Sequence, residues 1–196
     1  MPRPAPHPKA GCDIIIRDVA AVYEPFQPSP YPKAGCGIRR YTGSGYLDMN
    51  PVSRGKSPQS LASSSTIGHV NSLERALRDK RYAVPEDVFI GRSVNGSMTT
   101  RESFQNAVAG DVITDWGLQS WAITDNPAFG GGKVKLFAVL PKDTTAGAYV
   151  ASVSSSGEHE KEFLLNRGTG FLVHRVEQHP VAYGGSETWL IGEILG

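Results

Sequence analysis

Two glutamates stand one residue apart where the chain enters an apolar run, in the segment HEKEFLLNRG at residues 159–168. Side chains of a strand alternate between its two faces, so Glu160 and Glu162 would share one face, about 7 Å apart, if 160–165 is a strand. Two carboxylates at this separation suit a reaction in which each group acts on a different part of the substrate. The alternative is a solvated acidic turn, since short charge runs usually lie in solvent.

Three further residues suggest related chemistry. Arg92 ends the apolar run VFIGR, and a guanidinium presented from a rigid strand suits a two-bond contact with a phosphate. Ser120, in DWGLQSWA, follows a glycine within a strand-like segment, where its hydroxyl can orient a carboxylate. Phe129 stands before GGG, and we expect it at the tip of a loop. Taken singly, these residues are equally consistent with a surface arginine, a half-buried serine and a loop anchor.

The order Arg, then Ser, then Glu-x-Glu resembles the arginine–serine–glutamate class of mono-ADP-ribosyltransferases, over about residues 38–177. The resemblance rests on RRYTGSGYLDMN, VFIGRSV, GDVITDWGLQSWA, FAVLPKDTTAGAYV and GEHEKEFLLNRGTGFLV. It implies an α+β ADP-ribosyltransferase fold, in which N-terminal helices are followed by two packed, mainly antiparallel sheets around an NAD cleft. It also implies that NAD is a co-substrate and that no metal is required.

The resemblance assigns roles to the residues that match the family pattern. Glu162 matches the catalytic carboxylate, which stabilises positive charge on the ribose as the bond to nicotinamide breaks. Glu160 matches the residue that engages a substrate arginine. Arg92 would bind the pyrophosphate and the nicotinamide-side ribose, and Ser120 would hold Glu162. Residues expected to line the NAD cleft besides Arg92 and Ser120 are Tyr41, Tyr46, Asn50, the backbone of Gly117, Phe129 and Lys133.

The sequence departs from the family pattern at two places. The Ser-Thr-Ser motif reads Ser120-Trp121-Ala122, so its third hydroxyl is absent. Gly132 replaces a loop arginine that helps to bind phosphate in relatives, and Lys133 is the adjacent cation. We expect these changes to affect NAD affinity rather than the class of enzyme.

Along the chain we expect helices first and strands later, and these elements must position the site residues. This order favours an α+β fold. Residues 37–50 show near-helical spacing, and the Ser-rich stretch 57–70 is expected to be a surface loop. Residues 69–81 are predicted to form an amphipathic helix. Its buried face would carry Val70, Leu73 and Leu77, and its solvent face Glu74, Arg75 and Arg78. Strands are predicted within residues 85–94, 110–124, 133–141, 147–153, 160–166, 168–177 and 187–195.

The N-terminal residues 1–36 read as a leader or linker, and 37–196 as the catalytic domain. The leader holds eight of the 14 prolines, which exclude regular helix there. It contains the pentapeptide PKAGC twice, ending at Cys12 and Cys36. We interpret the repeat as a local duplication, with a disulfide between the two cysteines as the alternative.

Composition narrows the possible functions. The 196 residues are enough for one domain, and 20 basic against 19 acidic residues argue against a nucleic-acid binder. There is neither an apolar run of transmembrane length nor a signal peptide, so a secreted effector using another route is expected.

The preferred hypothesis is an arginine-specific toxin of interbacterial competition, acting in the cytoplasm of the target cell. Its target would be a protein such as the tubulin-like division GTPase, and the producing cell would need an immunity protein. Alternatives are an NAD glycohydrolase, modification of RNA or of actin, and a pseudoenzyme that only binds a partner.

Overall fold

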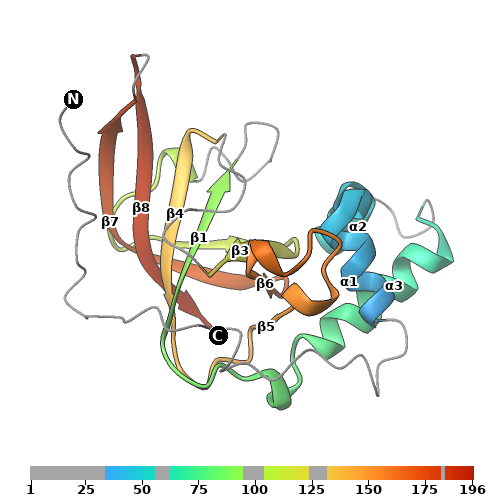
Figure 1. Ribbon diagram of the computed structural model, residues 1–196. Coiled ribbons are helices and arrows are strands. Elements are labelled where there is room, and N and C mark those ends of the chain that lie inside the picture. Colours follow the sequence, from blue (N-terminus) through green and yellow to red (C-terminus); the bar gives the residue numbers. More distant parts are fainter. Residues whose placement is uncertain (1–33, 56–61, 95–103, 124–131, 182–183) are drawn as a thin grey trace.

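The computed structural model describes residues 34–55, 62–94, 104–123, 132–181 and 184–196. Helices at the N-terminal end of the described chain pack against one side of a sheet that the remaining chain forms (Figure 1). None of the described helices has the length and apolar character needed to cross a membrane.

The first helical block consists of α1 (Ala34–Arg40), the π-turn η2 (Tyr41–Gly45) and α2 (Tyr46–Ser53). Gly43 lies outside helical geometry, with φ −88° and ψ −124°, and bends the chain between the two helices. Gly45 is required for close approach, because a Cβ there would lie 2.6 Å from the carbonyl oxygen of Arg40. Helix α1 takes in Ala34–Cys36, which were expected to belong to the leader, and buries Ala34 completely.

Helix α3 (Ser64–Ala76) begins within the stretch that was expected to be a loop, so that prediction is wrong from Ser64 onward. The reason is a cap: Ser63 Oγ accepts a hydrogen bond of 3.0 Å from the backbone N–H of Thr66. The helix also ends earlier than the predicted residue 81, and a short 3₁₀ turn, η3 (Lys80–Tyr82), follows it.

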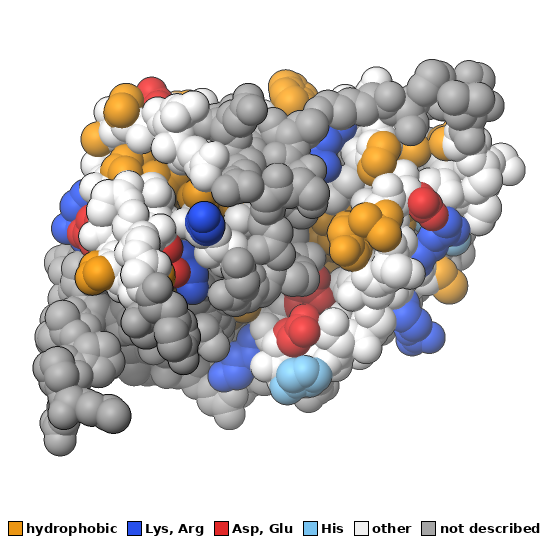
Figure 2. All heavy atoms as spheres, turned by 90° about the horizontal axis from the view of Figure 1, so that it is seen from above, with side chains coloured by type: hydrophobic (Ala, Val, Ile, Leu, Met, Phe, Trp, Pro, Cys, Tyr) orange, Lys and Arg blue, Asp and Glu red, His pale blue; other side chains and the backbone are white. Residues whose placement is uncertain are grey.

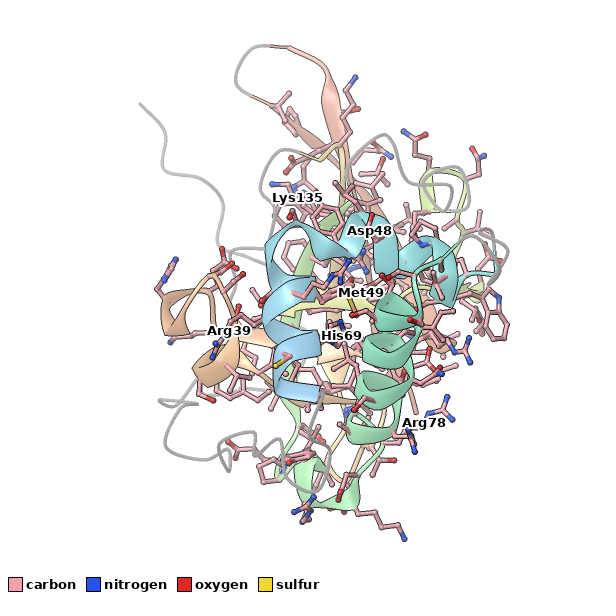
Figure 3. All side chains as sticks on the ribbon, turned by 90° about the vertical axis from the view of Figure 1, so that its right-hand side faces the viewer. Arg39, Asp48, Met49, His69, Arg78 and Lys135 are labelled. Carbon is pink, nitrogen blue, oxygen red and sulfur yellow. The ribbon has the colours of Figure 1, made fainter. Side chains whose placement is uncertain are left out.

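The inner face of α3 matches the prediction, since Val70, Leu73 and Leu77 are buried. Glu74 was expected in solvent but is buried, because its carboxylate pairs with Arg167 at 2.8 Å. Figure 3 views the helices from the right of Figure 1: α1 and α3 lie side by side in front of the sheet, and Arg78 points away from it.

Eight strands form one mixed sheet in the order β2-β7-β8-β4-β1-β3-β6-β5, in which only β4 and β8 pair in parallel. Two short 3₁₀ turns, η4 (Ala151–Val153) and η5 (Glu158–Glu160), lie between β5 and β6. The strands are β1 (Val88–Val94), β2 (Val112–Asp115), β3 (Gln119–Ala122), β4 (Val134–Leu140), β5 (Gly147–Tyr149), β6 (Glu162–Leu165), β7 (Thr169–Pro180) and β8 (Ser186–Leu195).

The expectation of two packed sheets is wrong for the described residues, because the strands form a single hydrogen-bonded sheet. Strands β1 and β3 join its two parts through one register pair, Gly91 with Ala122. One apolar core, containing Ile90, Leu136 and Phe163, lies against the sheet, and a second, containing Ile38 and Leu164, lies between the sheet and the helices. The α+β class and the order of elements are as predicted.

Candidate active site

Glu162 is the first residue of β6 and is 4% exposed. Its two carboxylate oxygens each accept a hydrogen bond from a serine hydroxyl. Ser120 Oγ donates to Oε1 at 2.6 Å, and Ser154 Oγ donates to Oε2 at 2.7 Å. Ser120 reaches Glu162 because β3 pairs with β6, with Ala122 directly opposite Glu162. The carboxylate therefore has a fixed orientation.

The electrostatic surroundings of Glu162 work in opposite directions. Burial raises the pKa of its carboxyl, and the hydrogen bonds from Ser120 and Ser154 lower it. The nearby charge of Glu160 adds to the increase. The net pKa is raised, so the charged form of Glu162 depends on its two hydroxyl donors.

Glu160 does not lie in the strand with Glu162, so the prediction that both carboxylates share one strand face is wrong. It is the last residue of η5 and is exposed. Lys161, between them, has φ 45°, a left-handed conformation that breaks the strand before it begins. Its carbonyl oxygen accepts a hydrogen bond of 3.0 Å from Ile123 N–H, which holds this turn against the end of β3.

Arg92 lies inside β1 rather than at its end, and it is buried. Its Nη1 donates to Gln119 Oε1 at 3.2 Å and lies 3.9 Å from Asp115 Oδ2. Burial lowers the pKa of Arg92, while the Asp115 carboxylate opposes that change. An arginine remains charged under these conditions, so β1 holds a buried cation beside β3.

Asp115 also binds a second arginine that sequence reasoning missed. Arg54 Nε and Nη2 donate to its two carboxylate oxygens, both at 3.0 Å. Gly117 N–H donates to Asp115 Oδ1 at 2.8 Å, so the amide expected to hold nicotinamide already has an acceptor here. A Cβ at residue 117 would lie 2.6 Å from Arg54 Nη2, so a larger residue there would displace the guanidinium that binds Asp115.

Tyr41 and Asn50 are both buried and hold the backbone of Leu118. Tyr41 Oη donates to the carbonyl oxygen of Leu118 at 2.6 Å, and Asn50 Oδ1 accepts from its N–H at 2.8 Å. Burial raises the pKa of Tyr41 to about 12, and its hydroxyl interacts electrostatically with both Arg92 and Glu162. Tyr41 and Asn50 therefore fix the segment that joins β2 to β3.

The remaining predicted residues are Tyr46, Lys133 and Phe129. Tyr46 is 39% exposed on α2. Lys133 is exposed beside β4, and Gly132 before it is buried against the backbone of Val94. Phe129 lies outside the described residues. Within the described ranges, no three His, Cys, Asp or Glu side chains gather closely enough to hold a metal ion.

Ser154, Arg54 and Asp115 are the site residues that sequence reasoning missed. Ser154 lies in a serine run, SVSSSG, directly after the predicted strand within residues 147–153. Arg54 is the last residue of NPVSR and directly follows helix α2, and Asp115 is the first residue of DWG. The sequence held a signal for Arg54 and Asp115: they carry opposite charges, and each stands beside a segment that was predicted to line the NAD cleft.

This arrangement suits the cleavage of a bond in a substrate that carries a phosphate, where positive charge develops on the reacting atom as the bond breaks. Glu162 supplies a fixed negative charge. Arg54 and Arg92 share one carboxylate, which leaves an excess of positive charge suited to a phosphate. Elsewhere on the surface, Figure 2 shows acidic and basic side chains interspersed, without a continuous basic area among the described side chains of that face.

In a comparison with protein families, the model described as ADP-ribosyltransferase exoenzyme matches residues 27–191 of the chain. A comparison with curated protein sequences gives no match.

Several solved structures share the fold. C3stau2 from S. aureus, solved with NAD, is 21% identical with a TM-score of 0.64, covering 84% of this chain and 87% of that one. Plx2a, a toxin from Paenibacillus larvae, is 15% identical with a TM-score of 0.64, covering 83% and 85%. BECa of a C. perfringens binary enterotoxin, solved with NADH, is 19% identical with a TM-score of 0.65, covering 86% of this chain and 46% of that one.

Proposed function

Because the chain belongs to the ADP-ribosyltransferase exoenzyme family, it is an ADP-ribosyltransferase, and we propose that it transfers ADP-ribose from NAD to an arginine of a target protein. The observation that carries the proposal is the buried Glu162 carboxylate, held on both oxygens by Ser120 and Ser154. A carboxylate fixed in this way stabilises charge that develops in a transition state without having to reorganise.

Glu162 acts at the bond between ribose and nicotinamide. As this bond breaks, nicotinamide leaves with the bonding electron pair and the ribose takes on oxocarbenium character. The negative charge of Glu162 stabilises that cation. Ser120 and Ser154 favour the ionised carboxylate against the effect of burial, which otherwise raises its pKa.

Arg92 and Arg54 are assigned to the pyrophosphate of NAD. Both guanidinium groups contact Asp115, at 3.9 and 3.0 Å, so they are held in place before substrate arrives. A planar guanidinium makes two parallel bonds to a phosphate, which a lysine does not. Tyr41 and Asn50 support this end of the site by fixing Leu118.

Glu160 is assigned to the incoming arginine. It is exposed at the end of η5, where a protein surface can reach it. A guanidinium nitrogen forms the new bond to the ribose carbon, and the proton it loses passes to Glu160. The two carboxylates thus have separate tasks, in agreement with their different environments.

The variant Glu160→Gln tests arginine specificity. It should still release nicotinamide from NAD to water, within about threefold of the wild-type rate, because bond cleavage draws on Glu162. Transfer to protein should fall at least 100-fold, on the order of the loss of one essential acid–base group. Labelled NAD and a cell lysate measure both rates, and Glu86→Gln, an exposed glutamate before β1, is the control.

The alternatives give different results in the same assay. Equal losses of transfer and hydrolysis would remove the support for arginine as acceptor. Free ADP-ribose without labelled protein in the wild type would identify an NAD glycohydrolase, and labelled RNA would identify a nucleic acid as the acceptor.

We also propose that the protein is an antibacterial effector whose acceptor is a cytoplasmic protein, such as the tubulin-like division GTPase, with actin as the alternative. The Pro-rich residues 1–36, which suit a link to a delivery module, support this role. A cognate immunity protein would then protect the producing cell. Mass spectrometry of ADP-ribosylated peptides from exposed bacterial and eukaryotic cells distinguishes the two kinds of target.

A further inference from the structure

The second donor to Glu162, Ser154, is not part of either strand that carries the predicted site. It follows η4 and lies in extended geometry, with φ −63° and ψ 146°. Its N–H bonds to the carbonyl oxygen of Val150 at 2.9 Å, and Val150 N–H bonds to the carbonyl oxygen of Glu162 at 2.9 Å. The backbone therefore brings Ser154 to Glu162 through one intermediate residue.

Two hydrogen bonds determine which way the Ser154 hydroxyl points, and a third fixes the segment that carries it. Ser156 N–H donates to Ser154 Oγ at 3.2 Å, so the oxygen serves as an acceptor on that side and directs its own proton to Glu162 Oε2. Thr42 Oγ1, from η2, accepts a bond of 2.8 Å from the N–H of Ser155. The segment that presents Ser154 is thus fastened to the helical block.

The sequence shows why a second donor is needed. Ala122 stands directly opposite Glu162 in the β3–β6 pair and offers no hydroxyl. Ser120 reaches only Oε1, which leaves Oε2 to Ser154. A buried carboxylate oxygen without a donor has no compensation for lost hydration.

We propose that Ser154 is a positioning residue of the active site, which orients the Glu162 carboxylate and keeps it ionised in place of a hydroxyl at residue 122. The proposal rests on the proposed function, since it assigns Ser154 to the carboxylate that acts on NAD. The hydroxyl of Ser154, on a turn outside the strands, completes the hydrogen bonding of the buried Glu162 carboxylate.

The test compares Ser154→Ala with Ser154→Thr, which keeps the hydroxyl and suits the extended backbone, and with Ser152→Ala, an exposed neighbour. In Ser154→Ala, we expect kcat for NAD hydrolysis at pH 7 to fall about tenfold, as for loss of a hydrogen bond to a charged group. The KM for NAD should change less than about twofold, since Ser154 acts through Glu162. Ser154→Thr should recover most of the rate, and Ser152→Ala should match the wild type.

The pH profile separates positioning from a merely structural role. Loss of the Ser154 donor raises the pKa of Glu162, so the acid limb of kcat should move to higher pH. The other titratable groups that act near this carboxylate are Glu160 of η5, which raises its pKa, and Tyr41 of η2, which stays neutral in this range. A variant that loses thermal stability but keeps the wild-type acid limb would overturn the proposal.

A second measurement is independent of activity. The pKa of Glu162 can be followed by NMR of ¹³C-labelled glutamate side chains, with the signal assigned from Glu162→Gln. We expect a higher pKa in Ser154→Ala than in the wild type. An unchanged pKa refutes the role of Ser154 even in an active enzyme. A wild type that does not cleave NAD refutes the proposed function and leaves the NMR test of Ser154 intact.

Discussion

Asp115→Asn is expected to be among the most destabilising single-atom changes in this protein. Asp115 is 1% exposed and accepts two bonds of 3.0 Å from Arg54 and one of 2.8 Å from Gly117 N–H. It also lies 3.9 Å from Arg92, a buried cation. Asparagine keeps the shape and removes the charge, so both guanidinium groups lose their shared anion.

The magnitude follows from the burial of the group. Removing one partner of a buried ion pair costs about 3–5 kcal/mol of unfolding free energy. For a domain of this size each kcal/mol lowers Tm by about 2–4 °C, so Tm should fall by about 6–20 °C. The matched control is Asp48→Asn, whose pair with Arg40 is 3.1 Å long and has side chains 64% and 34% exposed. Exposed pairs contribute about 0–1 kcal/mol.

Urea unfolding at pH 7, followed by the fluorescence of the three tryptophans, measures both variants. The m-values should equal that of the wild type, so the midpoints report stability directly. The double variant Arg54→Gln with Asp115→Asn should lose less than the sum of the two single losses, because the groups interact. A loss below about 1 kcal/mol for Asp115→Asn, indistinguishable from the control, would refute the role of Asp115 as the shared anion.

Two further variants test the assigned roles. Glu162→Gln should lower NAD cleavage at least 100-fold, as for other preorganised electrostatic groups, while nicotinamide release near the wild-type rate would exclude its role. The same variant should be more stable than the wild type at pH 7. Burial raises the pKa of Glu162 in the folded protein, so protonation of this carboxyl stabilises the wild-type fold at low pH. That contribution is lost as the pH rises through the folded pKa. The stability difference measured by urea should therefore grow from pH 4 to pH 7. Arg92→Lys should raise the KM for NAD about tenfold or more, because lysine lacks the planar fork, whereas Arg39→Lys on the exposed face of α1 (Figure 3) should leave it unchanged.

The positions of the strands along the chain and most of the helical residues followed from local patterns. Residues 133–141 were predicted to contain a strand and form β4, with Val134, Leu136 and Ala138 in the core. The Ser-rich start of α3 was misread, because serine favours loops by composition while Ser63 acts here as a helix cap. Propensity describes a residue type, whereas a cap depends on the three residues that follow it.

The site was predictable where the residues lie on paired strands. Ser120 and Glu162 meet because β3 pairs with β6, and the resemblance to the family, rather than a predicted strand pairing, led us to expect this contact. Ser154 was out of reach of such reasoning, since its place depends on the 3₁₀ turn and on bonds to η2. The separation of Glu160 from the strand depends on the left-handed Lys161, a conformation that no spacing rule anticipates for a lysine.

The left-handed turn at Lys161 also has an evolutionary consequence. Glu160 is exposed, so substitutions there change the stability of the fold by about 0.5 kcal/mol or less, whereas Glu162 is enclosed by two hydroxyl donors. On the proposed division of tasks, a lineage can exchange residue 160 and with it the acceptor that is modified, while every intermediate sequence stays folded and still cleaves NAD. Under this proposal, the turn places the residue that selects the acceptor on the surface, apart from the buried carboxylate that cleaves NAD.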